Sequence, residues 1–453
     1  GGKTWSNVTP SGITPWSKIA QLDASHFDDQ TVYAAVNRFR LDDLHPHIYR
    51  THDGGKTWKE IDTGLPDDAP VNTVREDPVR KGLLYAGTET TVYVSFDDGD
   101  HWQSLRQNLP ATSIRDLVVK DSDLVVATHG RSFWILDDVT PLRQLSAQTS
   151  DETAHLFAPA AAFRVHRDTY TDTPLPPEEP VGQNPPDGAI IDYYLGSTPK
   201  SPVTLEILDA SGKLVRRYAS NDRPEVTEKQ IDALNVPAYW IRRPRILSAA
   251  PGMHRWIWNL HYSDPSVLMH QYPISAIYMD TPRLPLGPAA LPGTYTARLT
   301  VDGKSYTQPF VVKMDPRVHT PAADLQQQFT LATHIASMIE RDFDAVVEGR
   351  ALLNQLQEAR THNPGASASV RAAIDTLHAH VEALRITRLN STLGGLLETI
   401  DGVDARPTTQ ATAAVSALQQ QLDAAIVDWN RVRGSELNSL NAKLKAAGIP
   451  AVA

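Results

Sequence analysis

Short runs of alternating apolar and polar residues fill the first 140 positions, and this period of two predicts β-strands. Turn residues separate the runs, which fall into three consecutive groups. The first two groups have four runs each, whereas the third has three before Pro141. The expected strands are 17–22, 31–36, 47–51 and 58–61; 71–76, 83–87, 92–96 and 101–105; 113–119, 124–128 and 132–137.

A turn motif recurs after the third strand of the first two groups. It spans Thr51–Trp58 and then Ser95–Trp102, and the start of the chain, Gly1–Trp5, repeats the end of the first copy. Hydroxyl and carboxylate groups can hydrogen-bond the turn backbone, Gly allows a positive φ, and Trp can pack between neighbouring sheets. We expect a structural role for Thr51, Asp53, Gly55, Thr57, Trp58, Ser95, Asp97, Gly99 and Trp102.

The rest of the chain predicts two further domains and a connection. Residues 141–187 read as a Pro-rich linker or strap, because Pro occurs six times between Pro174 and Pro186. Short strand-like runs over 188–316 predict an immunoglobulin- or fibronectin-like β-sandwich with long insertions near 222–250 and 263–292. Residues 317–453 predict an antiparallel three-helix bundle. The seam expected on its first helix is Phe329, Ala332, Ala336, Ile339, Phe343, Val346 and Leu353.

Composition narrows the classes of function. The chain has 453 residues, no Cys and a formal net charge of -10. These values argue against a generic nucleic-acid binder, thiolate chemistry and Cys-ligated zinc. No apolar run reaches the ~18 residues of a membrane-spanning helix. We found no nucleotide, nucleophile-elbow or metalloprotease motif, and we expect no cofactor and no metal.

A few charged residues on the first 140 positions are candidates for chemistry. A glycosidase needs two carboxylates across a sugar, and Glu76, Asp77, Glu89 and Asp116 are candidates, although no catalytic residue can be assigned. Arg75 and Arg115 occupy matching places on the expected first strands of successive groups, and with Arg131 they could hold a ligand carboxylate. Alternatively, these Arg residues bridge neighbouring sheets. The candidate ligand-binding set is Arg75, Glu76, Glu89, Arg115, His129 and Arg131.

The two turn motifs are similar to the Asp box of BNR-type β-propellers, although His101 replaces the usual Thr in the second. Residues 28–138 resemble a bacterial family of BNR-repeat proteins described as sortilin-like or glycosyl hydrolase-like. The strings that carry the resemblance are Tyr49–Trp58, Val74–Pro78, Leu84–Glu89 and Ala127–Asp138. The resemblance implies an exported parent, periplasmic or secreted, with a propeller, a β-sandwich and a helical tail.

The expected fold is therefore multidomain, mainly β and then α: a partial propeller over 1–140, followed by the strap, the sandwich and the bundle. Because the chain begins within its own repeat, we expect a C-terminal fragment whose remaining propeller blades lie upstream in the same polypeptide. We favour a non-catalytic binding or scaffold module for a protein, peptide or glycan. The alternative is part of a sialidase- or xyloglucanase-like glycoside hydrolase with most catalytic residues upstream. A purely structural module that completes the propeller is a third interpretation.

Overall fold

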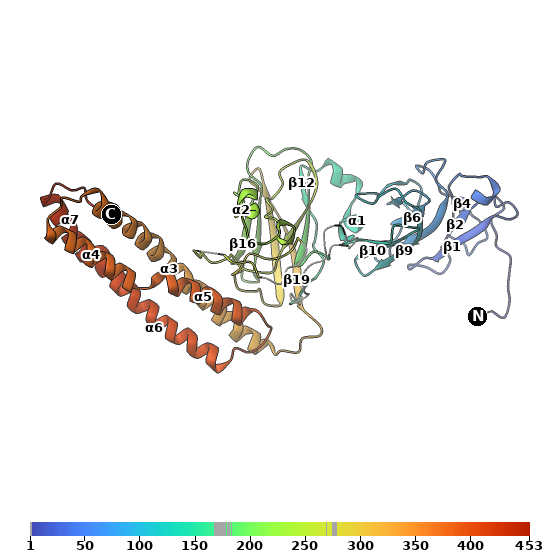
Figure 1. Ribbon diagram of the computed structural model, residues 1–453. Coiled ribbons are helices and arrows are strands. Elements are labelled where there is room, and N and C mark those ends of the chain that lie inside the picture. Colours follow the sequence, from blue (N-terminus) through green and yellow to red (C-terminus); the bar gives the residue numbers. More distant parts are fainter. Residues whose placement is uncertain (1, 167–177, 179–181, 183, 269, 274–278) are drawn as a thin grey trace. The chain divides into compact units, whose positions relative to one another are not determined.

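The computed structural model describes residues 2–166, 178, 182, 184–268, 270–273 and 279–453. The chain divides into two compact units, Gly1–Asp151 and Glu152–Ala453 (Figure 1). The first unit consists mainly of sheets. The second contains two further sheets and a set of long helices.

Three antiparallel sheets form the first unit, and within each sheet the strands follow one another in chain order. The predicted groups of four, four and three strands are confirmed, with ends that move by at most two residues. The first sheet comprises β1 (Lys18–Ala24), β2 (Val32–Asn37), β3 (His47–Thr51) and β4 (Lys59–Glu60); the second comprises β5 (Val71–Glu76), β6 (Leu84–Thr88), β7 (Val92–Ser95) and β8 (Gln103–Ser104); the third comprises β9 (Ile114–Lys120), β10 (Asp123–Thr128) and β11 (Phe133–Leu136).

Apolar side chains fill the space between consecutive sheets. Tyr33 and Ile48 of the first sheet pack with Val74 and Leu84 of the second in one buried cluster. A second cluster joins the second and third sheets. Each sheet is therefore buried against its neighbour as well as hydrogen-bonded internally, and this arrangement is why β-branched and aromatic residues are favoured here. Short helices flank the sheets at Phe39–Leu41, α1 (Thr140–Gln144) and Ala147–Asp151.

Two sheets of the second unit share a single core. The core includes Tyr193 and Trp258 from one sheet and Leu205 and Phe310 from the other. Strands β13 and β19 pair in parallel, and the other strand pairs described in these two sheets are antiparallel. The smaller sheet has the order β12 (Ala154–Leu156), β14 (Ala189–Leu195), β17 (Gly252–Trp258); the larger has β13 (Ala162–Arg164), β19 (Lys304–Met314), β18 (Gly293–Val301), β15 (Thr204–Leu208), β16 (Leu214–Ala219).

The range 141–187 differs from the predicted strap. Strands β12 and β13 lie within it, and each pairs with a strand much later in the chain. Most of the Pro-rich stretch Pro174–Pro186 lies outside the described residues. Two short helices, α2 (Glu228–Asp232) and a 3₁₀ turn at Ala238–Trp240, lie within the first predicted insertion. The division into four domains stays a prediction.

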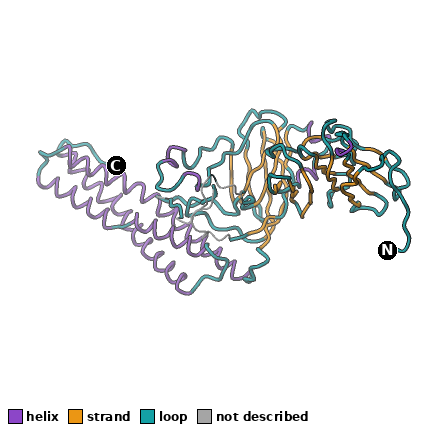
Figure 2. The backbone as a smooth tube through the Cα atoms, turned by 45° about the vertical axis from the view of Figure 1, so that its right-hand side comes forward, coloured by secondary structure: helices purple, strands orange, loops and turns teal. Residues whose placement is uncertain are grey.

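The C-terminal helices follow three antiparallel paths along one another (Figure 2). The first is α3, a single helix of 41 residues. The second path is divided into two helices at Arg385, which adopts a left-handed φ of 53°, and the third contains a π-helical turn at Val432–Glu436. The helices are α3 (Ala322–His362), α4 (Ala368–Ala383), α5 (Ile386–Asp401), α6 (Thr409–Arg431) and α7 (Leu437–Ala446).

Among the described residues, none of the helices combines the length and the apolar character that crossing a bilayer requires.

Candidate functional site

The two turn motifs of the first unit have the same hydrogen bonds. In the first, Thr51 Oγ1 accepts a hydrogen bond from the Gly55 N–H at 3.0 Å, and Asp53 accepts one from the Thr57 N–H at 2.8 Å. In the second, Ser95 Oγ accepts from the Gly99 N–H at 2.9 Å. These bonds satisfy turn N–H groups that would otherwise lack partners. Thr51, Asp53 and Ser95 therefore each bond a backbone N–H group within their own turn.

Asp97 completes the second motif in the way that Asp53 completes the first. It accepts a hydrogen bond from the His101 N–H at 2.9 Å, and its other oxygen lies 2.7 Å from His101 Nδ1. His101 thus makes the contact that the Thr57 hydroxyl makes with Asp53. The hydrogen bonds from Thr57 lower the pKa of Asp53 to about 2. Burial alone would raise the pKa of Asp97, but its bonds with His101 and Ser95 outweigh that effect and lower it.

The Trp of each motif bonds a repeated position of the preceding segment. Trp102 Nε1 donates to the carbonyl oxygen of Ile61 at 2.8 Å, and Trp58 Nε1 donates to that of Val8 at 2.8 Å. Ile61 and Val8 each lie three residues after the Trp of the preceding copy, Trp58 and Trp5. Val8, near the start of the chain, thus accepts the hydrogen bond from the first motif's Trp, just as Ile61, directly after β4, accepts that from the second motif's Trp.

Glycine is required where the second motif meets the first sheet. Gly99 has a φ of 89°, and a Cβ there would overlap the Cδ1 atom of Ile61. Gly55 has a φ of 86°, and a Cβ there would lie 2.8 Å from Val8 Cβ. A left-handed backbone and a close neighbour therefore coincide at both positions, which explains the Gly in both motifs.

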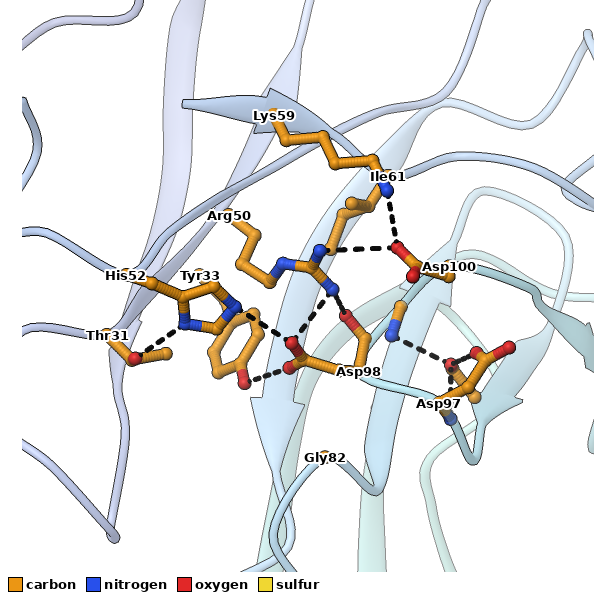
Figure 3. Close-up of polar contacts among 12 residues, drawn as sticks. Thr31, Tyr33, Arg50, His52, Lys59, Ile61, Gly82, Asp97, Asp98 and Asp100 are labelled. Carbon is orange, nitrogen blue, oxygen red and sulfur yellow. Dashed lines mark hydrogen bonds and ion pairs between the residues drawn. The ribbon is translucent and has the colours of Figure 1, made fainter. Parts of the chain in front are cut away.

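Asp98 is the hub of a network that joins the first and second sheets (Figure 3). It occupies the place of Gly54 in the second motif and keeps a positive φ of 64°. Its carboxylate accepts from Tyr33 Oη at 2.6 Å and lies 2.9 Å from His52 Nε2 and 2.8 Å from Arg50 Nη1. Burial and the hydrogen bond to Asp98 raise the pKa of Tyr33, so the phenol stays protonated and donates.

Arg50 extends this network along the same edge. It also donates to the backbone oxygen of Asp98 and forms an ion pair with Asp100 at 3.2 Å. Lys59 pairs with Asp100 at 2.7 Å (Figure 3). The hydrogen bond from Lys59 is the main cause that lowers the pKa of Asp100. The sequence analysis singled out neither Asp98 nor Arg50, because their partners lie on another sheet.

Arg75, a candidate ligand-binding residue, instead bridges the first strands of all three sheets. Its Nη1 donates to Asp23 of β1 at 3.0 Å and its Nη2 to Asp116 of β9 at 3.0 Å. Its Nε donates to the backbone oxygen of Leu117 at 2.7 Å. All three guanidinium nitrogens are engaged. This geometry favours the bridging interpretation over the ligand-binding one.

The strand register corrects the expected match between Arg75 and Arg115. Each sheet has an irregularity near the start of its first strand, after Ile19, Val71 and Ile114. When the first strands of the three sheets are aligned at these irregularities, Arg115 of β9 corresponds to Asn72 of β5. Arg75 of β5 corresponds to Asp23 of β1 and Val118 of β9. The two Arg residues therefore do not form a repeated cluster.

The candidate carboxylates are separated along the second sheet. Glu76 ends β5 and is 1 % exposed, and it accepts hydrogen bonds from the N–H groups of His26 and Gly82. Glu89 lies at the other end, where its N–H donates to Pro70 just before β5. Five residue steps of about 3.3 Å place these ends about 17 Å apart. Glycosidase carboxylates are only ~5–10 Å apart, so these two cannot act as a pair.

The other two candidate carboxylates also have protein partners. Asp77 is fully buried and receives two hydrogen bonds from Arg143 Nε, both at 3.0 Å. Asp116 pairs with Arg75 as described above. A catalytic acid needs access to substrate, which the burial of Asp77 and Glu76 prevents.

The remaining candidates lie at the loop end that carries Glu89. Arg115 Nη1 donates to Glu89 at 3.1 Å, and Asn72 Nδ2 donates to the same oxygen at 3.0 Å. In the third sheet, His129 occupies the position that Glu89 occupies in the second, since its N–H donates to the backbone oxygen of Ser113 just before β9. Arg131 follows in the same loop and is exposed. We call Glu89, Arg115, His129 and Arg131 the loop rim.

Comparisons with known proteins found only distant solved structures. The sequence matches no established protein family and no curated protein. YCF48 bound to D1 peptide is 17 % identical and covers 27 % of this chain with a TM-score of 0.21. A GH74 enzyme of Niastella koreensis is 14 % identical and covers 43 % at 0.22, and an ancestral GH74 enzyme is 12 % identical and covers 64 % at 0.22.

The chain spans only 37 %, 29 % and 35 % of the length of these three structures, respectively. At these TM-scores the similarity carries no argument about activity. The interpretation of this protein therefore depends on its own contacts.

Proposed function

We propose that residues 1–140 form part of an Asp-box β-propeller and act as a non-catalytic binding or scaffold module of an exported protein. The ligand would be a protein, a peptide or a glycan. The observation that carries the proposal is that most of the candidate charged side chains already bond to neighbouring residues within the fold. Arg75, Glu76, Asp77 and Asp116 are all engaged by neighbouring residues, and Glu76 and Glu89 lie at opposite ends of one sheet.

The loop rim is the surface that we assign to ligand contact. Side chains of Arg115 and Glu89 are 45 % and 28 % exposed, so both remain accessible beside their mutual ion pair. In the described part of the chain, the side chains of His129 and Arg131 have no hydrogen-bond or ion-pair partner. Such a mixed-charge edge suits polar groups of a peptide or glycan. Further propeller blades of the same polypeptide would supply the rest of this surface.

The same proposal covers the second unit in outline. We assign the two sheets that share a core, formed by residues 188–316 together with β12 and β13, to an immunoglobulin- or fibronectin-like sandwich, and the helices over 317–453 to a bundle that supports it. The shared apolar core favours this assignment.

A glycan-and-peptide array with the full-length protein tests the proposed function. We expect binding to a discrete set of ligands that Arg131→Ala and Arg115→Ala weaken. We also expect no turnover of aryl glycosides or sialosides. Turnover that Glu89→Gln or Arg115→Ala abolishes would instead establish the glycoside hydrolase alternative and overturn the non-catalytic proposal.

A further inference from the structure

A cavity of about 300 Å³ lies in the second unit, between its sheets and the last turn of α5. Its wall includes Arg164 at the end of β13, His261 after β17, and Glu398 and Asp401 on α5. Leu260, Leu284 and Leu397 are among the apolar residues that line it. This combination of apolar walls and a few polar groups is typical of small-molecule sites, at the lower end of their size range.

The cationic side chains of this cavity already have anionic partners. Arg242 Nε donates to Asp280 at 2.7 Å. Arg164 Nη2 forms an ion pair with Asp404 at 2.6 Å, and both side chains are about nine-tenths buried or more. Asp404 also lies 3.2 Å from His166 Nε2. The positive charges in the wall are therefore compensated within the protein.

Two carboxylates of the cavity lack such compensation. Within the described residues, the Glu398 carboxylate forms no ion pair and no hydrogen bond. Asp401 Oδ2 accepts from the Ala289 N–H at 3.0 Å, but its nearest cationic candidate is His261, at 3.7 Å. Glu398 and Asp401 are three residues apart on α5 and so lie on the same helix face.

His261 adds an acceptor rather than a positive charge. Its Nδ1 lies 2.6 Å from the Gly287 carbonyl oxygen, which can only accept, so Nδ1 must carry the hydrogen. Burial lowers the pKa of His261 and favours the neutral ring, although Asp401 opposes this effect. In the neutral tautomer with Nδ1–H, Nε2 is an acceptor.

We propose that this cavity binds a small organic cation, a molecule with an ammonium group on a short apolar chain. An ammonium has three N–H donors and no acceptor, and it would meet Glu398, Asp401 and His261 Nε2. The apolar walls would contact the alkyl chain. Burial raises the pKa of Glu398, and it also raises that of Asp401, although His261 and Arg164 oppose the rise at Asp401. Bound cation would supply that missing charge.

Isothermal titration calorimetry of the full chain with 1,4-diaminobutane tests this proposal. Butane-1,4-diol is the neutral probe of matched length, and succinate is the anionic one. We expect binding of the diamine and no binding of the diol or succinate. Glu398→Gln should weaken diamine binding by about tenfold or more, as expected for loss of a charge-assisted contact. Glu358→Gln, an exposed change on α3, should leave it unchanged.

A second variant keeps the test decisive if Glu398→Gln affects folding. Glu398→Lys places an ammonium in the wall itself, where it can pair with Asp401, and should abolish diamine binding while the melting temperature is kept. Absence of diamine binding to the native chain would overturn the proposal. So would equal binding of diamine and diol, or equal weakening by Glu398→Gln and Glu358→Gln. The array variants Arg115→Ala and Arg131→Ala lie in the first unit, so their effects are distinguishable from each of these results.

Discussion

The sheets of the first unit and the C-terminal helices differ in how they accommodate a buried carboxylate. Asp77 is fully buried after β5, yet Arg143 and the N–H groups of Val79 and Arg80 all donate to it. Asp342 is equally buried on α3. In the described part of the chain, neither of its carboxylate oxygens has a hydrogen-bond partner.

The pKa of Asp342 reflects this difference. Burial raises it to about 7, and the nearby amide of Asn390 on α5, which does not reach full hydrogen-bond geometry, counters the rise only in part. The Nδ2 atom of Asn390 likewise has no partner among the described residues. In the first unit, the buried Asp77 is stabilised by the guanidinium of Arg143 on α1 and by backbone N–H groups of its own turn. On α3, the Asp342 carboxylate is buried by helix packing without a hydrogen-bond partner, and such burial lowers the stability of the fold. The same substitution should therefore have opposite signs in the two regions.

Asp77→Asn should show the largest loss of stability. Removal of the carboxylate charge leaves the Arg143 guanidinium, which is 9 % exposed, without its counter-ion. Breaking a buried pair in this way costs about 3–5 kcal/mol. Chemical denaturation followed by tryptophan fluorescence would measure it, with hydrogen exchange of β5–β7 to locate the loss. Asp121→Asn, at a side chain 82 % exposed, is the control and should change little. An equal effect of both variants would contradict the pairing argument.

Gly99→Ala tests the contact between the second turn motif and the first sheet. The left-handed backbone costs about 1–2 kcal/mol with a Cβ, and forcing a methyl group against Ile61 costs about 1–3 kcal/mol more. Gly130→Ala is a matched control, because its φ is 86° but a Cβ there would meet nothing within 4 Å. We expect thermal unfolding to show a clearly larger loss for Gly99→Ala. Equal losses would mean that the close contact does not matter.

The sheets were predictable from sequence because their signals are local. Strands alternate with period two, and the turn motifs place Thr51, Asp53 and Gly55 within a few residues of their hydrogen-bond partners. The partners of Arg75 and Asp98 are on other sheets, so their roles could not be read from spacing. The irregularity near the start of each first strand also shifted the expected match of Arg115.

The helical seam was predicted only in part. Ala332, Ile339 and Val346 are buried as expected, but Phe329, Ala336, Phe343 and Leu353 are only half-buried. A second buried row steps by seven residues, and three of its members are polar or small, so an apolar pattern does not mark them. This row is Gln328, Ile335, Asp342, Gly349 and Leu356. The cavity beside α5 was missed for a related reason, since its residues come from distant segments.

Asp342→Asn should stabilise the protein, the opposite of Asp77→Asn. The folded state binds more protons than the unfolded state between pH 3.8 and about 7, so Asp342 lowers stability as pH rises through that window. We expect a gain of about 1–3 kcal/mol at pH 8 that fades towards pH 4. Denaturation at several pH values, with hydrogen exchange of α3, would measure it. Asp344→Asn, on the exposed side of α3, should give no such pH-dependent gain. A loss of stability at pH 8 would show that the carboxylate has a favourable partner.

Asp53→Asn should have the smallest effect on stability, and its pH dependence should be opposite to that of Asp342→Asn. Because the pKa of Asp53 is lowered to about 2 from 3.8, its carboxylate stabilises the fold above pH 3.8, and this contribution is lost as pH falls towards 2. The native protein should therefore lose its advantage over the variant between pH 4 and pH 2 in thermal unfolding. Asp67→Asn, at an exposed residue outside the motif, should follow the native protein at every pH. A constant difference between native protein and Asp53→Asn across this range would mean that the charge of Asp53 does not hold the turn, and that its oxygen atoms alone suffice.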